Sequence, residues 1–100
     1  MQQRRNAIKF EAKTIKSISI DTQYGCMYIR FSNEKVAHTI EHSEIVNIDM
    51  AKDGEVIGIE FVSLKRPART IFLELAKIYN RPELKKVPSA LRHQLQAITA

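Results

Sequence analysis

The sequence predicts an α+β fold in which an antiparallel β-meander of about five strands is packed by one amphipathic helix, with a further helix at the C-terminus. Two observations support this class. Between residues 15 and 62, apolar and polar residues alternate in short runs separated by turn residues, which is the pattern of half-buried strands. From Pro67 onward, apolar residues recur every three or four positions, which is typical of a helix that covers one face of a sheet.

The first two predicted strands are IKSISI at 15–20 and CMYIRF at 26–31. In the second strand Met27, Ile29 and Phe31 share one face and alternate with residues on the other. The intervening DTQYG contains residue types that favour turns, so we expect a hairpin.

The third predicted strand, KVAHTIEH at 35–42, contains two histidines four residues apart. On a helix, His38 and His42 would share a face and could bind one zinc ion. The neighbouring β-branched residues and the short distance to the adjacent strands favour extended backbone instead. On a strand the two histidines lie about 13 Å apart, so no metal site is predicted.

The fourth and fifth predicted strands are EIVNIDM at 44–50 and EVIGIEFV at 55–62. Asp53 and Gly54 predict the hairpin between them, because both residue types tolerate positive φ. Gly58 weakens the middle of the last strand unless another group lies close above it. We therefore expect either that a helix packs across Gly58 or that the strand bends there.

The segment KRPARTIFLELAKIYN predicts the helix that covers the sheet. Pro67 suits the first helical position, and Asn80 and Pro82 suit the end of the helix. Its apolar stripe is interpreted as core and consists of Ala68, Ile71, Phe72, Leu75, Ile78 and Tyr79.

Beyond Pro82 the sequence predicts a loop or single turn, followed by a helix over about residues 88–99. The apolar stripe on this helix is narrow and consists of Leu91, Leu95 and Ile98. Such a stripe docks either on its own domain or in a groove of another chain, so these three residues are the predicted partner-binding site.

Three parts of the chain are predicted: a flexible basic arm at 1–8, an α+β domain at 9–80 and a basic C-terminal helical extension at 81–100. No segment reaches the roughly 20 apolar residues that a membrane-spanning helix needs. No apolar run follows Arg4 and Arg5, as it would in a signal peptide. A cytoplasmic location without membrane contact is therefore expected.

The net charge of +5 is unevenly distributed. Residues 1–16 contain five basic residues and one acidic residue, residues 17–64 contain three basic and eight acidic residues, and residues 65–100 contain eight basic and two acidic residues. Two interpretations stay open: the basic ends contact an acidic partner or a polyanion, or they pack on the acidic middle of the same chain.

The stretches IDTQYGCMYIRFS at 20–32 and IDMAKDGEVIGIEFVSL at 48–64 carry a family resemblance. Together they make residues 15–64 similar to the Domain of Unknown Function 2283 family of small bacterial and archaeal proteins. The first stretch departs from the family pattern at Ile20 and Gly25. The second stretch fits closely through Asp49, Asp53, Gly54, Val56, Gly58, Ile59 and Glu60.

This resemblance implies a compact β-sheet module with an accompanying helix and no established catalysis. Genes of the family are thought to lie beside small ribonuclease-like toxins, so the resemblance also implies an antitoxin-like role.

The residues themselves predict a protein-interaction module that is not an enzyme. Phosphate-cradle, hydrolase and metalloprotease motifs are absent from the sequence, and no catalytic residue, cofactor or metal is predicted. Asp49 and Glu60 lie on neighbouring predicted strands, but exposed strand carboxylates are usually solvated. The expected partner of the C-terminal segment is a toxin-like protein or a second copy of the chain, and a homo-oligomer is expected.

The alternative hypothesis is sequence-tolerant binding of nucleic acid through the basic N- and C-terminal segments. Few aromatic residues interleave with the basic ones, so stacking on single strands is not indicated. The predicted contacts are Lys65, Arg66, Arg69, Arg81, Lys85, Lys86 and Arg92.

Overall fold

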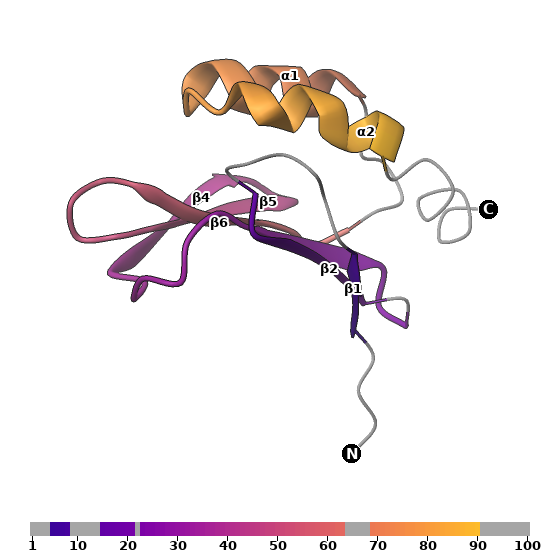
Figure 1. Ribbon diagram of the computed structural model, residues 1–100, viewed down its shortest axis with the longest axis horizontal. Helices are drawn as coiled ribbons and strands as arrows, with labels where there is room; N and C mark the ends of the chain where they lie inside the picture. The colour runs from indigo at the N-terminus through magenta and orange to yellow at the C-terminus, as the bar shows by residue number, and fades with distance from the viewer. Residues whose placement is uncertain (1–4, 9–14, 22, 64–68, 91–100) are drawn as a thin grey trace.

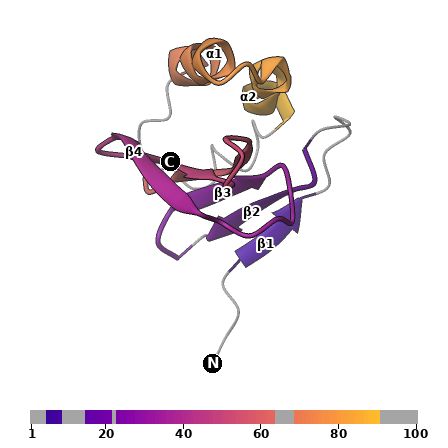
Figure 2. The same ribbon diagram turned by 90° about the vertical axis from the view of Figure 1, so that its left-hand side faces the viewer.

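The computed structural model describes residues 5–8, 15–21, 23–63 and 69–90, and it shows one antiparallel sheet with helices over one of its faces (Figures 1 and 2). The strands are β1 (Arg5–Ile8), β2 (Ser17–Asp21), β3 (Cys26–Arg30), β4 (His38–Ser43), β5 (Val46–Met50) and β6 (Val56–Phe61). The helical layer consists of α1 (Arg69–Ile78), the 3-10 helix η1 (Pro82–Lys86) and α2 (Val87–Ala90). The predicted α+β class is confirmed.

The strand order in the sheet is β1-β2-β3-β6-β5-β4. Consecutive strands are neighbours at every step except between β3 and β4. After β3 the chain passes through residues 31–37 to the far edge of the sheet and returns through β5 to place β6 beside β3. This single crossover separates β3 from β5 by one strand.

Strand β1 corrects the prediction of a flexible arm at residues 1–8. It pairs with β2 in antiparallel register, from Arg5 opposite Asp21 to Ile8 opposite Ile18. Four residues with no alternation of apolar and polar types give no local signal for a strand. The pairing with β2 therefore determines the conformation of β1.

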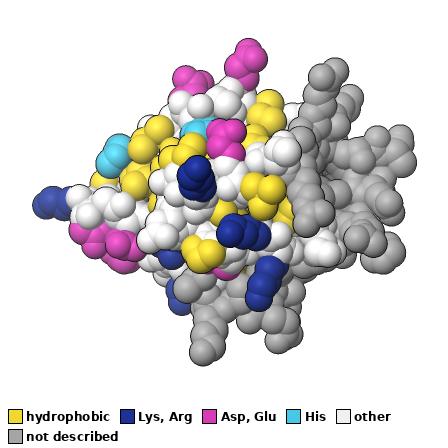
Figure 3. All heavy atoms as spheres, turned by 90° about the horizontal axis from the view of Figure 1, so that it is seen from above, with side chains coloured by type: hydrophobic (Ala, Val, Ile, Leu, Met, Phe, Trp, Pro, Cys, Tyr) yellow, Lys and Arg dark blue, Asp and Glu magenta, His cyan; other side chains and the backbone are white. Residues whose placement is uncertain are grey.

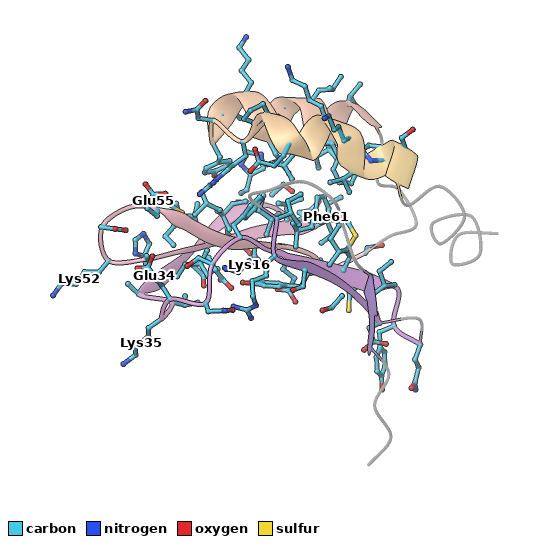
Figure 4. All side chains as sticks on the ribbon, in the orientation of Figure 1. Lys16, Glu34, Lys35, Lys52, Glu55 and Phe61 are labelled. Carbon is cyan, nitrogen blue, oxygen red and sulfur yellow. The ribbon has the colours of Figure 1, made fainter. Side chains whose placement is uncertain are left out.

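The hydrophobic core lies between the sheet and the helical layer. Alternate residues of the strands are buried there, as the period of two requires. Phe61 of β6 stacks on Phe72 of α1 with ring centroids 5.0 Å apart. Figure 4 shows Phe61 on the side of the sheet that faces the helices.

Helix α1 ends as the sequence predicts. Asn80 has φ of 54°, and the N–H of Arg81 donates to the carbonyl of Ala76 at 2.9 Å, which is a Schellman cap. The predicted stripe is correct for Phe72 and Leu75, which are fully buried, whereas Ile78 is exposed. The predicted first residue, Pro67, lies outside the described residues.

The C-terminal segment forms the predicted single turn as η1, and its helix begins at Val87. Leu84 and Val87 are completely buried and belong to the core between sheet and helices. The domain therefore extends at least to Val87, and the predicted boundary near residue 81 does not separate the core from an extension. The remainder of the predicted helix lies outside the described residues.

Gly58 is covered by a side chain and not by a helix. A Cβ atom at this position would overlap the ring and hydroxyl of Tyr28, which lies on the sheet face opposite the helices. The register between β5 and β6 also shifts here: Asp49 is opposite Gly58, whereas Met50 is opposite Val56. Of the two alternatives expected at Gly58, the structure shows an irregular strand, and the group that covers the glycine is Tyr28.

Candidate interaction surfaces

The sheet face opposite the helices carries a hydrogen-bonded cluster centred on Asp49. The Tyr28 hydroxyl donates to Oδ2 of Asp49 at 2.7 Å, and Oγ1 of Thr39 donates to Oδ1 at 2.6 Å. Tyr28 is on β3 and Asp49 on β5, so the tyrosine side chain crosses over β6 to reach the carboxylate. It crosses at Gly58, where the missing side chain leaves room for the ring.

Glu60 has a separate hydrogen-bond donor on this face. Nδ2 of Asn47 on β5 donates to Oε1 of Glu60 at 3.2 Å. Arg30 lies with its guanidinium carbon 5.2 Å from the centroid of the Tyr28 ring, within cation–π distance. Asp49 thus accepts from the adjacent strand β4 and from β3, which lies beyond β6, and Glu60 accepts from the adjacent strand β5. These hydrogen bonds connect the strands and stabilise the sheet.

The pKa of Tyr28 is raised far above its ordinary value of 10.0. Burial is the main cause, because it disfavours the charged phenolate, and the hydrogen bond to the Asp49 carboxylate adds to it. Above pH 10.0 the unfolded chain therefore loses the proton of the Tyr28 hydroxyl, while the folded chain keeps it. The resulting stabilisation is present below this pH and is lost as the pH rises.

We expect the Tyr28→Phe variant to lose this pH dependence. Between about pH 9 and 11 the free energy of unfolding of the wild type should fall more steeply than that of the variant, by up to about 1.4 kcal/mol per pH unit. Urea unfolding followed by circular dichroism at a series of pH values measures both slopes. Parallel curves for the two proteins would contradict the assignment of the proton to Tyr28.

His42, one of the two β4 histidines whose spacing raised the question of a metal site, connects β4 to α1. Nε2 of His42 donates to Oε2 of Glu74 at 3.0 Å, and the Tyr79 hydroxyl lies 3.4 Å from Nδ1. His38 and His42 lie on a strand, as predicted. The described part of the chain contains no group of three or more His, Cys, Asp or Glu side chains that could hold a metal ion.

A groove of about 800 Å³ lies at the end of the sheet, between the loop before β4 and the β5–β6 turn. Glu34, Lys35, Lys52 and Asp53 contribute to its lining. Figure 4 shows Lys35 and Lys52 pointing away from the body of the molecule, with Glu34 nearby. The lining of this groove thus contains two lysines and two acidic residues.

A second groove, of about 500 Å³, lies on the helical layer between α1 and η1. Its lining contains Leu73, Lys77 and Lys85. Leu73 is 42% exposed, and both lysines are exposed. Figure 3, which looks down on the helical layer, shows Lys or Arg side chains beside hydrophobic ones on this face. We call this feature the basic groove.

Arg81, one of the predicted nucleic-acid contacts, is engaged within the fold. Its guanidinium lies 3.4 Å from Glu55 and 3.7 Å from Glu83, donates to the carbonyl of Val56 at 3.4 Å, and packs 4.8 Å above the ring of Phe31. It therefore joins the start of η1 to the sheet. In the described ranges it forms the one ion pair between the basic C-terminal segment and the acidic middle of the chain.

The other predicted contacts divide into two groups. Lys85 and Lys86 are exposed on η1, and Arg69 is the first described residue of α1. The remaining predicted residues lie outside the described part of the chain: Lys65, Arg66, Leu91, Arg92, Leu95 and Ile98.

Sequence reasoning missed Leu73 as a surface residue. It lies off the predicted apolar stripe of α1 and four positions before Lys77, so the two side chains share the outer flank of the helix. The signal in the sequence that could have identified Leu73 as a surface residue is its position outside the apolar stripe of the helix.

These features define a small α+β domain with one helix-covered sheet face, one polar sheet face and an exposed basic groove. The family described as "Protein of unknown function (DUF2283)" matches residues 17–65, which confirms the family resemblance predicted from the sequence. The matched segment contains β2 to β6 and ends before α1, so β1 and the helical layer lie outside it.

Neither the curated proteins nor the solved structures include a significant match to the chain. Among the described residues, no helix has the length and apolar character that crossing a membrane requires.

Proposed function

We propose that this chain is a non-enzymatic protein-interaction module that binds an acidic partner protein through the basic groove. The observation that carries the proposal is that Leu73, Lys77 and Lys85, all exposed, line one groove of about 500 Å³. An acidic amphipathic segment suits such a surface, because an apolar anchor would cover Leu73 while flanking carboxylates approach the lysines.

An antitoxin-like role in the cytoplasm is the specific form of this proposal that the sequence resemblance favours. In that form the partner is a toxin-like protein encoded by the adjacent gene. Leu91, Leu95 and Ile98 are further partner contacts that the sequence predicts for this form.

We expect the double variant Lys77→Glu/Lys85→Glu to bind the product of the adjacent gene at least about tenfold more weakly than the wild type. The matched control is Lys35→Glu/Lys52→Glu, which makes the same charge change at the far end of the sheet and should bind normally. Co-expression with a tagged partner, followed by titration calorimetry of the purified proteins, measures the difference. Equal binding by the two variants, or no binding by the wild type, would refute the proposal.

Deletion of residues 82–100 would not test this function. Leu84 and Val87 are fully buried, so the deletion would remove part of the core together with the groove. Charge reversal at exposed lysines avoids this problem, and circular dichroism of each variant verifies that the fold is retained.

Nucleic-acid binding is the second candidate, favoured by the exposure of Lys77, Lys85 and Lys86 on one layer of the molecule. None of these lysines pairs with a carboxylate of the described residues. In a mobility-shift assay with duplex DNA at low salt, this candidate requires a shift that weakens steeply as salt is added. Absence of any shift at low salt eliminates it and leaves the protein partner.

A further inference from the structure

The second edge of the sheet, β4, presents an exposed strand without a described neighbour. It is the last strand in the sheet order and pairs with β5 alone among the described strands. Residues 38–41 are exposed, and β4 contains neither proline nor lysine, the residues with which proteins commonly block an edge. The unpaired backbone groups of such a strand are a template for another strand.

Apolar side chains accompany this edge. Ile40 of β4 is 38% exposed, and Ile78 of α1 is 55% exposed. The hydrogen bond between Glu74 and His42 brings one flank of α1 next to β4, and Ile78 lies one helical turn after Glu74 on that flank. Figure 3 shows histidine side chains beside hydrophobic ones on the described surface. The edge strand and this helix flank form what we call the β4 edge surface.

We propose that a second copy of this chain binds the β4 edge surface, with the two β4 strands antiparallel about a two-fold axis at Ile40. In this register Ile40 faces its counterpart, and Thr39 of each copy faces Glu41 of the other. Isologous pairing of this kind joins the two sheets into one and leaves neither β4 edge open.

The side chains that would face each other select this register over its neighbours. A two-fold axis perpendicular to the sheet pairs residues of the same face, so the adjacent registers centre on Thr39 or on Glu41. The first places Ile40 of each copy opposite His38 of the other, and the second places the two Glu41 side chains opposite each other. Like charges directly opposite destabilise a strand pair.

The register centred on Ile40 avoids the repulsion between the two Glu41 side chains and places the two apolar Ile40 side chains opposite each other.

The bulge in β4 limits the length of the contact. The register between β4 and β5 shifts between Glu41 and Ser43, so β4 is irregular at His42. Backbone pairing is therefore centred on residues 39–41, and the exposed Ile40 and Ile78 side chains supply the apolar area. A contact of this size predicts a reversible dimer with a dissociation constant on the order of micromolar.

Single cysteines in a Cys26→Ser background test both the pairing and its register. Ile40→Cys should form disulfide-linked dimers on mild oxidation, because a two-fold axis at this residue brings the two Cα atoms within disulfide distance. Thr39→Cys and Glu41→Cys should each crosslink poorly alone but efficiently when mixed, since those two positions face each other. The control is Leu73→Cys, which is similarly exposed on the other flank of α1.

Crosslinking of Ile40→Cys no greater than that of Leu73→Cys would overturn the proposal. Efficient crosslinking of Thr39→Cys or Glu41→Cys alone would overturn the register.

Sedimentation equilibrium gives an independent measurement. The wild type and Leu73→Lys should reach twice the 11.5 kDa of one chain at high concentration, whereas Ile40→Lys should weaken the dimer at least about tenfold. A monomeric wild type, or a dimer unaffected by Ile40→Lys, would refute self-pairing. Because Leu73 belongs to the basic groove, a dimer that survives Leu73→Lys also shows that the two surfaces act separately.

Discussion

The Leu84→Ala variant is expected to lose about 2–5 kcal/mol of its free energy of unfolding, although Leu84 lies in a short 3-10 helix. Its side chain is completely buried and belongs to the same hydrophobic cluster as Phe72 and Leu75 of α1. Truncation to alanine removes apolar area from the core and leaves a cavity between η1 and the rest of the fold. Small domains have a total stability of about 5–15 kcal/mol, so this loss would be a large share.

Urea unfolding measures the loss as a lower midpoint of the transition. The matched control is Leu73→Ala, the same chemical change at an exposed position, which should alter stability by less than about 0.5 kcal/mol. If Leu84→Ala behaved like this control, residues 82–90 would be a separable extension, as the sequence alone predicted. A large difference would confirm that the domain includes η1.

Strands β2, β3 and β5 could be predicted because each buries one face against the helices, and burial on one face imposes an alternation visible in the sequence. Strand β1 could not, since its four residues take their conformation from pairing with β2. The role of Leu84 was also hidden, because a 3-10 turn with a single buried leucine has no periodicity.

The surface residues were harder to predict because their roles depend on the order of the strands. Tyr28 and Asp49 are 21 residues apart in the chain and meet only because β6 lies between β3 and β5. The sequence marked Gly58 as a position of close approach but gave no indication of which group approaches. Likewise, the sequence predicted Arg81 as an exposed cation, and only the fold shows that Glu55 lies beside it.

Gly58→Ala is expected to destabilise the fold by about 1–3 kcal/mol, even though the backbone at Gly58 does not have positive φ. The new methyl group would overlap the ring of Tyr28, so the ring must move. Its displacement would break the hydrogen bond to Asp49, which ties β3 to β5 across β6. The cost arises from this collision, because alanine is otherwise better than glycine in a strand interior.

Removing the Tyr28 ring should reverse the sign of the effect of Gly58→Ala on the free energy of unfolding. In a Tyr28→Ala background the three atoms nearest to the new methyl group are gone, so Gly58→Ala should stabilise the fold by about 0.5–1 kcal/mol. In a Tyr28→Phe background the ring remains and the destabilisation should persist, which separates the effect of the collision from that of the hydrogen bond.

Urea unfolding of the single and double variants completes the double-mutant cycle, with an expected coupling energy well above about 0.5 kcal/mol. Equal effects of Gly58→Ala in the wild-type and Tyr28→Ala backgrounds would mean that Tyr28 does not cross β6 at this glycine. The cluster on the polar face would then lose its link between β3 and β5, because Gly58 is the position at which the tyrosine passes over β6.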